Sequence, residues 1–173
     1  MVSPARMAKT KRAPKGQSRP GRAAVGGGPA PRVVQRKGAA LFGTFVAEAP
    51  PMSRKIETIR QGVFARVVDD MVKYLDVPKL VIFGLLHMPD STAHKLIKDN
   101  RRLDSAASER VVRVADVTRM AQQTFGGREP AIRWLKTPNL ALAGVTPLSL
   151  LDTEPGASEV RRIISSIDYG GVV

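Results

Sequence analysis

Few residues in this chain could carry covalent or metal chemistry. It contains no cysteine and only two histidines, His87 and His94. A thiolate nucleophile and a cysteine-ligated zinc site are therefore excluded, and neither histidine has a second histidine four residues away. We expect no metal site.

The serines and carboxylates also lack the surroundings that catalysis requires. Ser91 and Ser105 stand where helix caps are expected, and no nucleophile elbow surrounds them. Asp69 and Asp70 are adjacent, so on a helix they point in different directions and do not form a working pair. We therefore expect no enzyme, no catalytic residue and no cofactor.

Two short helices are expected in the middle of the chain, at 78–86 and 91–100, with a tight turn between them. This arrangement within a helical bundle is typical of a helix-turn-helix, whose second helix enters the DNA major groove. The side chains expected on the exposed face suit hydrogen bonds to base edges and contacts with phosphates. They are Ser91, Thr92, His94, Lys95, Lys98, Arg101 and Arg102. A helix pair of this kind that only packs, without binding DNA, is the alternative.

The positive charge is concentrated at the N-terminal end. The formal net charge is +13, and ten of the 28 Lys and Arg residues lie within residues 1–38, which contain no Asp or Glu. Residues 1–51 are rich in Pro, Gly and Ala, so we expect a disordered basic tail that cannot offset its ordering entropy by burial. Such an arm would neutralise phosphates and make DNA binding sensitive to salt. A merely solvated extension, or a true start at Met7, are alternatives of equal weight.

The rest of the sequence has helical periodicity and no strand pattern, which predicts an all-α fold. Apolar residues recur at helical spacing from Ser53, and Gly62 is expected to bend or divide that segment. A longer helix is expected after Asp104-Ser105, which would cap it. The expected organisation is a helix-turn-helix domain at 52–127 followed by a small helical domain at 128–173. No apolar run approaches the length of a membrane span.

The last forty residues are short apolar segments separated by Pro and Gly. Thr146-Pro147 is a helix start, with the hydroxyl at the N-cap and the proline at the first helical position. A final helix is expected at 157–169, because Val160, Ile163, Ile164 and Ile167 form one apolar stripe. This part is too small to hold a core of its own, so we expect it to pack on another element.

The order of residues in this region resembles the toxin-binding domain of the Xre/MbcA/ParS antitoxins, over about residues 129–173. The matching positions are Trp134-Leu135, Pro138-Asn139, Leu142, Gly144, Thr146-Pro147-Leu148, Leu150-Leu151, Thr153, Gly156, Glu159-Val160, Ile167 and Gly170. The two short helices match the region that Xre-like members place before this domain. Phe83, His87 and Ser166 depart from the family pattern, which has a small residue, a glycine and an arginine at these places.

The resemblance implies an antitoxin of a bacterial type II toxin–antitoxin pair. Its partner would be a RES-domain toxin, of a family that degrades NAD or transfers ADP-ribose from it. The resemblance further implies operator DNA as a second partner, with a homodimer and a higher hetero-oligomer with the toxin. The residues expected to bind the toxin are Leu148, Leu151, Val160, Arg161, Ile164, Tyr169, Gly170, Val172 and Val173.

Two other classes of function stay open. One is a helix-turn-helix regulator without a toxin partner. The other is a protein that coats nucleic acid through its basic tail, without sequence preference. All three would be cytoplasmic, which the lack of cysteine allows.

Overall fold

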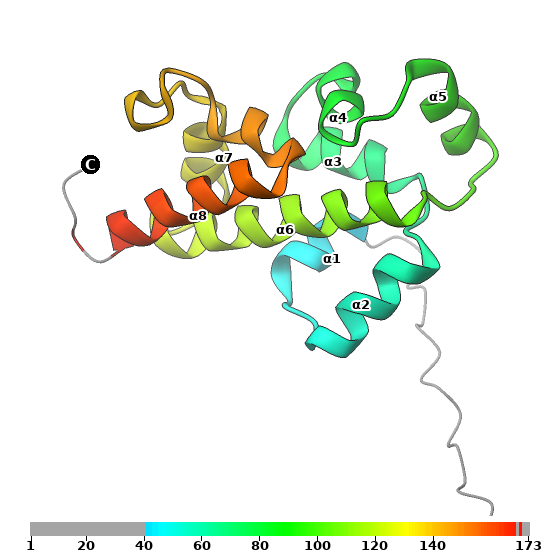
Figure 1. Cartoon of the computed structure of the whole chain (residues 1–173), viewed down its shortest axis with the longest axis horizontal. Coiled ribbons are helices and arrows are strands. Elements are labelled where there is room, and N and C mark those ends of the chain that lie inside the picture. Colours follow the sequence, from blue (N-terminus) through cyan, green and yellow to red (C-terminus); the bar gives the residue numbers. More distant parts are fainter. Residues whose placement is uncertain (1–40, 169, 171–173) are drawn as a thin grey trace, which may run out of the picture. The chain divides into compact units, whose positions relative to one another are not determined.

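The computed structural model describes residues 41–168 and 170, and within this part every regular element is helical (Figure 1). The all-α prediction is confirmed. The α-helices are α1 (Leu41–Ala47), α2 (Met52–Gln61), α3 (Val67–Leu75), α4 (Lys79–Leu85), α5 (Asp90–Lys98), α6 (Ser105–Phe125), α7 (Arg128–Lys136) and α8 (Glu154–Asp168). Two 3₁₀ helices, η1 (Leu140–Leu142) and η2 (Pro147–Asp152), lie between α7 and α8.

The long helix α6 is the element on which the others pack. Helices α1, α2, α7 and α8 all contact α6. In Figure 1, α6 is the yellow-green helix that runs alongside α8. Its start follows the predicted cap, because Asp104 Oδ1 accepts a hydrogen bond from the backbone N–H of Ala107 at 2.7 Å. It ends at Gly126, whose φ of 75° is left-handed.

Gly62 divides the predicted helix after Ser53, as expected. Both its backbone conformation and the close approach of a second segment require a glycine there. Its φ is 80°, and a Cβ at this position would lie 2.3 Å from the carbonyl oxygen of Leu103. The two segments approach so closely because Leu103 N–H donates to the carbonyl oxygen of Val63 at 2.8 Å. The N–H of Val63 in turn donates to Ser108 Oγ at 2.9 Å, which ties the break to α6.

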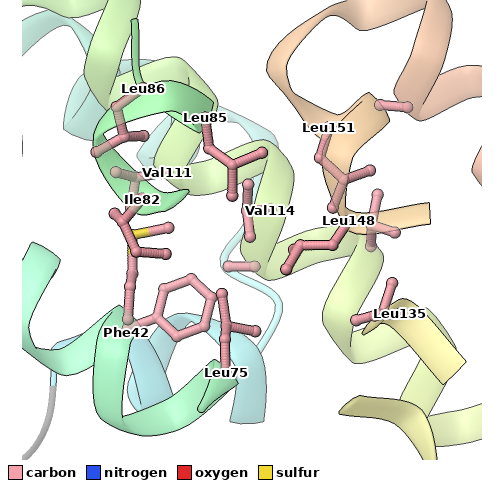
Figure 2. Packing of buried hydrophobic residues seen from close by; sticks show 14 of the residues in the cluster. Phe42, Leu75, Ile82, Leu85, Leu86, Val111, Val114, Leu135, Leu148 and Leu151 are labelled. Carbon is pink, nitrogen blue, oxygen red and sulfur yellow. The ribbon is translucent and has the colours of Figure 1, made fainter. Parts of the chain in front are cut away.

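A single hydrophobic cluster runs through the described residues (Figure 2). On one side of α6 it contains Phe42, Leu75 and Ile82, and on the other Leu135 and Leu151, with Val114 of α6 between the two groups (Figure 2). All six are almost fully excluded from solvent. The small C-terminal helices thus bury their apolar faces against a helix of the preceding region, as their size requires.

The predicted tail, 1–51, extends too far toward the C-terminus. Helix α1 lies inside this range, and its Phe42 and Val46 are 0% and 1% exposed. The apolar side chains of Phe42, Phe45 and Val46 recur at helical spacing and pack toward α3 and α6. Their burial offsets the entropy cost of ordering this segment, which the composition of the tail does not reveal. Residues 1–40, which make up most of the predicted tail, lie outside the described residues.

The final helix starts at Glu154, three residues earlier than predicted. Pro155 and Gly156 do not interrupt it, because proline is tolerated in a first helical turn. Thr153 takes the capping role, with Oγ1 accepting from the N–H of Gly156 at 3.3 Å. A Cβ on Gly156 would lie 2.2 Å from the carbonyl oxygen of Leu150, so this glycine permits close approach of α8 and η2.

None of the helices in the described part of the chain is both long and apolar enough to cross a membrane. The same residues contain no group of three His, Cys, Asp or Glu side chains that could hold a metal ion.

Candidate DNA-binding and partner-binding surfaces

The turn between α4 and α5 is built on a left-handed residue. His87 has a φ of 53°, the conformation for which a glycine is usual, and its N–H donates to the carbonyl oxygen of Gly84 at 3.0 Å. Met88 N–H closes the turn by donating to the carbonyl oxygen of Phe83 at 2.9 Å. Pro89 then stands at the N-cap of α5. The chain therefore forms the tight turn that the resemblance implied, with a histidine in place of glycine.

Phe83 occupies the crossing of α4 and α5, where a small residue was expected. Its side chain is 3% exposed, and its ring meets the His94 ring edge to face with centroids 5.4 Å apart. Ala93 is fully buried beside this contact. The two helices pack with the Phe83 ring and the small side chain of Ala93 both buried.

Helix α5 exposes the side chains that were predicted to meet DNA. Five of them, together with Arg101 after the helix, are on the exposed side, while Ala93 faces the core and Leu96 and Ile97 are half-buried. The five are Ser91, Thr92, His94, Lys95 and Lys98. Hydroxyls at the start of the helix and lysines further along it can supply hydrogen bonds to bases and charge to phosphates.

Arg102 is exposed like the rest of the predicted DNA-binding set, and it also makes contacts within the chain. Its guanidinium lies over the Phe64 ring at 4.3 Å from the centroid and donates to the carbonyl oxygen of Gly62. The group therefore holds the segment at 62–64 against the segment before α6. The structure gives Arg102 a packing role that the sequence did not predict.

Four of the residues predicted to bind the toxin are buried inside the chain. Leu148, Leu151, Val160 and Ile164 are at most 4% exposed, because η2 and α8 press their apolar faces on α6. In this fold their side chains do not reach the surface, so any role in partner binding is to shape the elements that carry exposed residues. The apolar stripe predicted on the last helix does lie on one face, and that face packs into the hydrophobic core.

The other predicted toxin-binding residues lie at the surface or outside the described residues. Arg161 is half-buried on α8 and holds Glu154 through both terminal nitrogens, the shorter distance being 2.9 Å. Gly170 is exposed, with a φ of 72°, and its N–H donates to the carbonyl oxygen of Ile167. Tyr169, Val172 and Val173 are outside the described part.

Sequence reasoning missed the most exposed apolar residue of the C-terminal region. Leu140, in η1, is 95% exposed, and Val145 nearby is 43% exposed. In the sequence the run Leu140–Val145 contains only apolar residues and Gly144, and it lies between Pro138 and Pro147. No local signal marks Leu140 as exposed, because its exposure depends on which side of η1 the distant helices leave uncovered.

Glu154 is the electrostatic link between α6 and α8. Its Oε2 lies 3.0 Å from Nε of Arg113, a residue of α6 that is 9% exposed, and its Oε1 lies 2.9 Å from Arg161. The hydrogen bond from Arg161, followed by the charges of Arg161 and Arg113, lowers the pKa of Glu154 against the opposing effect of burial. Arg113 also pairs with Glu109 and donates to the carbonyl oxygen of Leu151 at 3.3 Å.

A second set of polar contacts joins the helix-turn-helix turn to η2. His87 Nε2 lies 3.2 Å from Oδ2 of Asp152. Arg110 of α6 donates to the carbonyl oxygens of Asp152 and Leu86, at 3.3 and 3.5 Å. These contacts connect the turn before α5 to η2, the region that contains the predicted toxin-binding residues Leu148 and Leu151.

Together the elements define an all-helical protein with a helix-turn-helix at α4 and α5 and a small helical domain packed on the same long helix. Residues 55–116 match the family model of the antitoxin Xre-like helix-turn-helix domain. The Antitoxin Xre/MbcA/ParS C-terminal toxin-binding domain matches residues 120–170.

Similar proteins agree with both matches. An Antitoxin Xre of Yersinia enterocolitica is 31% identical over 116 residues, which cover 66% of this chain and 78% of the relative. A Sphingobium protein named Prs ADP-ribosylating antitoxin is 32% identical over 149 residues, 80% of this chain and 93% of the relative. An Antitoxin Xre of Pseudomonas putida is 32% identical over 83 residues, 48% of this chain and 52% of the relative. The chain belongs to the Xre/MbcA/ParS antitoxin family, whose homologues and domains are regulatory and not catalytic.

Proposed function

We propose that this protein is the antitoxin of a type II pair, which binds and neutralises a RES-domain toxin and represses its own operon. The observation that carries the proposal is the presence of both matched domains in one chain, at 55–116 and 120–170. Neither domain alone would connect a toxin to an operator.

The chemistry of the toxin is proposed from the family and from one relative. A RES-domain toxin acts on NAD, by degrading it or by transferring its ADP-ribose, and the Sphingobium relative carries the name Prs ADP-ribosylating antitoxin. We therefore assign the toxin partner of this chain to the NAD-consuming class. Neutralisation would follow when the C-terminal region, with Arg161 and residues 169–173, closes the entrance to the toxin's active site.

The DNA-binding part of the proposal rests on α5. Its exposed hydroxyls and lysines lie on one short helix after a closed turn, which suits entry into a major groove. In Figure 1, α5 lies toward one end of the helical unit and the end of α8 toward the other, an arrangement that leaves room for both partners. A homodimer on operator DNA, and a hetero-oligomer with the toxin, complete the proposal.

The test for toxin binding is co-expression with the product of the adjacent gene. We expect growth that this product arrests to be restored by the full chain, and a stable complex to co-purify. Light scattering then gives the stoichiometry. No complex and no rescue, with DNA binding intact, would leave a helix-turn-helix regulator without a toxin partner.

The test for DNA binding uses a labelled duplex from the region upstream of the gene. We expect Lys95→Ala with Lys98→Ala to weaken binding strongly, whereas Lys73→Ala with Arg54→Ala, which removes the same charge elsewhere, should change it little. Removal of residues 1–38 leaves α1 intact and tests the tail. If that removal abolishes binding and moderate salt does the same, the protein coats nucleic acid through its tail.

A further inference from the structure

The loop between α7 and η2 presents one leucine almost fully to solvent. Leu140 is 95% exposed, more than any other large apolar residue that the structure shows at the surface. Val145, at the other end of the same loop, is 43% exposed. In Figure 1 this gold loop and the red end of α8 lie toward the same end of the helical unit.

The loop is held in a fixed shape, so the exposure of Leu140 is not the result of a loose chain. Asn139 N–H donates to the carbonyl oxygen of Val145 at 3.0 Å, and Gly144 N–H donates to that of Asn139 at 2.9 Å. Asn139 Oδ1 accepts from the N–H of Ala141 at 2.9 Å, and left-handed backbone at Ala143 turns the chain back. A preorganised side chain of this kind loses little entropy when it binds.

The side chain of Leu142 fixes the loop to the hydrophobic core. It is 6% exposed and belongs to the hydrophobic cluster, while Leu140, two residues away, points out of it. Together the two leucines fix one side of η1 to the protein and offer the other side to a partner.

The occupant of this surface is a protein and not nucleic acid. Residues 137–151 contain no Lys, Arg, Asp or Glu, so the loop cannot neutralise phosphates. Large apolar side chains that fill a pocket in a partner are the usual anchors of protein interfaces, where they account for much of the affinity.

We propose that Leu140, supported by Val145, is the docking anchor of this chain for its toxin, inserting into an apolar pocket on the toxin surface. The inference rests on the proposed function, and the loop lies inside the matched toxin-binding span, 120–170. It replaces the buried residues Leu148, Leu151, Val160 and Ile164 with exposed ones as the source of direct apolar contact.

The test compares binding of the co-purified RES-domain protein to the full chain and to Leu140 variants. Leu140→Ala is expected to weaken the Kd by about 30-fold or more, and Leu140→Asp by more still, because a charge would enter an apolar pocket. Leu140→Met should retain binding. Leu80→Asp, at an exposed leucine of α4, is the matched control and should leave the Kd unchanged.

Thermal unfolding of every variant separates binding from folding, and we expect the Tm of Leu140→Ala to equal that of the unaltered chain. If the unaltered chain binds and Leu140→Ala binds within threefold of it, the docking anchor is wrong while the proposed antitoxin function stands. If the unaltered chain does not bind, both are wrong. If Leu140→Asp instead dissociates a homodimer and leaves toxin binding intact, the loop joins two copies and the inference is overturned.

Discussion

Nε of Arg113 lies 3.0 Å from Oε2 of Glu154, so the first turn of α8 is held to the middle of α6 by an ion pair with one nearly buried partner. Arg161 grips the same carboxylate from α8 itself. The two arginines stabilise the charged form of Glu154, which keeps its pKa below the ordinary value. The position of the C-terminal helix therefore depends on a charge that acid can remove.

The first prediction concerns pH. Because the folded pKa of Glu154 is lowered, its contribution to stability is fully present above the unfolded pKa and is lost as pH falls through the folded pKa. Glu154→Gln should lower the free energy of unfolding near pH 7 by on the order of 1 kcal/mol, since the carboxylate is partly exposed. The difference between the two proteins should shrink below about pH 4.5. Urea unfolding at several pH values measures this.

Glu159→Gln is the matched control for that prediction. Glu159 pairs with Arg162 three residues away on the same exposed helix face, and its pKa is also lowered, by the Arg162 hydrogen bond. Its loss should affect stability less than loss of Glu154, because no second helix is held by the pair. Equal effects at the two positions would contradict the link between α6 and α8.

The second prediction concerns the backbone of His87. Its φ of 53° costs a side-chain-bearing residue about 1 kcal/mol that glycine does not incur. Both His87→Gly and His87→Ala remove the contact with Asp152, so their difference isolates the backbone term. The glycine variant should be more stable to urea than the alanine variant by roughly 1 kcal/mol, less the glycine's greater freedom in the unfolded chain. An alanine variant of equal or greater stability would show that the turn is not left-handed.

The third prediction contrasts two glycines. Gly156→Ala places a Cβ 2.2 Å from the carbonyl oxygen of Leu150, so α8 and η2 must separate, and we expect a loss of about 1–3 kcal/mol. Gly84→Ala in α4 meets nothing within 4 Å and should stabilise the helix by roughly 0.5–1 kcal/mol. Chemical denaturation of both variants gives opposite signs if the packing is as described.

The fourth prediction separates Arg101 from Arg102. Arg102→Ala removes the contact with the Phe64 ring and the bond to Gly62, so it should lower stability by about 1 kcal/mol. Arg101→Ala removes an exposed side chain and should change stability by no more than about 0.5 kcal/mol. Calorimetric Tm values of the two variants decide the point. Equal losses would place both residues in the same structural role.

Most helix boundaries followed from local signals. Asp104 and Thr146 act as caps, Gly62 ends a helix, and the apolar residues of the last helix share one face. Each depends on a few neighbouring residues, which is why the sequence carries them. The presence of α1 could not be predicted from local signals, because the helix is stabilised only when α3 and α6 bury Phe42.

The candidate sites were harder to predict than the helices. Leu148 and Leu140 are both leucines beside a proline or a cap, yet one is 4% and the other 95% exposed. Periodicity shows which residues share a face and does not show which face is covered by a distant helix. Arg102 likewise has the charge of a DNA contact, but its position over Phe64 depends on a segment forty residues away.

The most direct test of the proposed function is the rate of NAD consumption by the RES-domain product of the adjacent gene, measured while the full chain is titrated in. We predict that the rate falls to background near a fixed stoichiometric ratio and that Leu140→Asp requires a large excess to reach the same inhibition. A rate unaffected by saturating amounts of the full chain would contradict the proposal that this protein neutralises such a toxin.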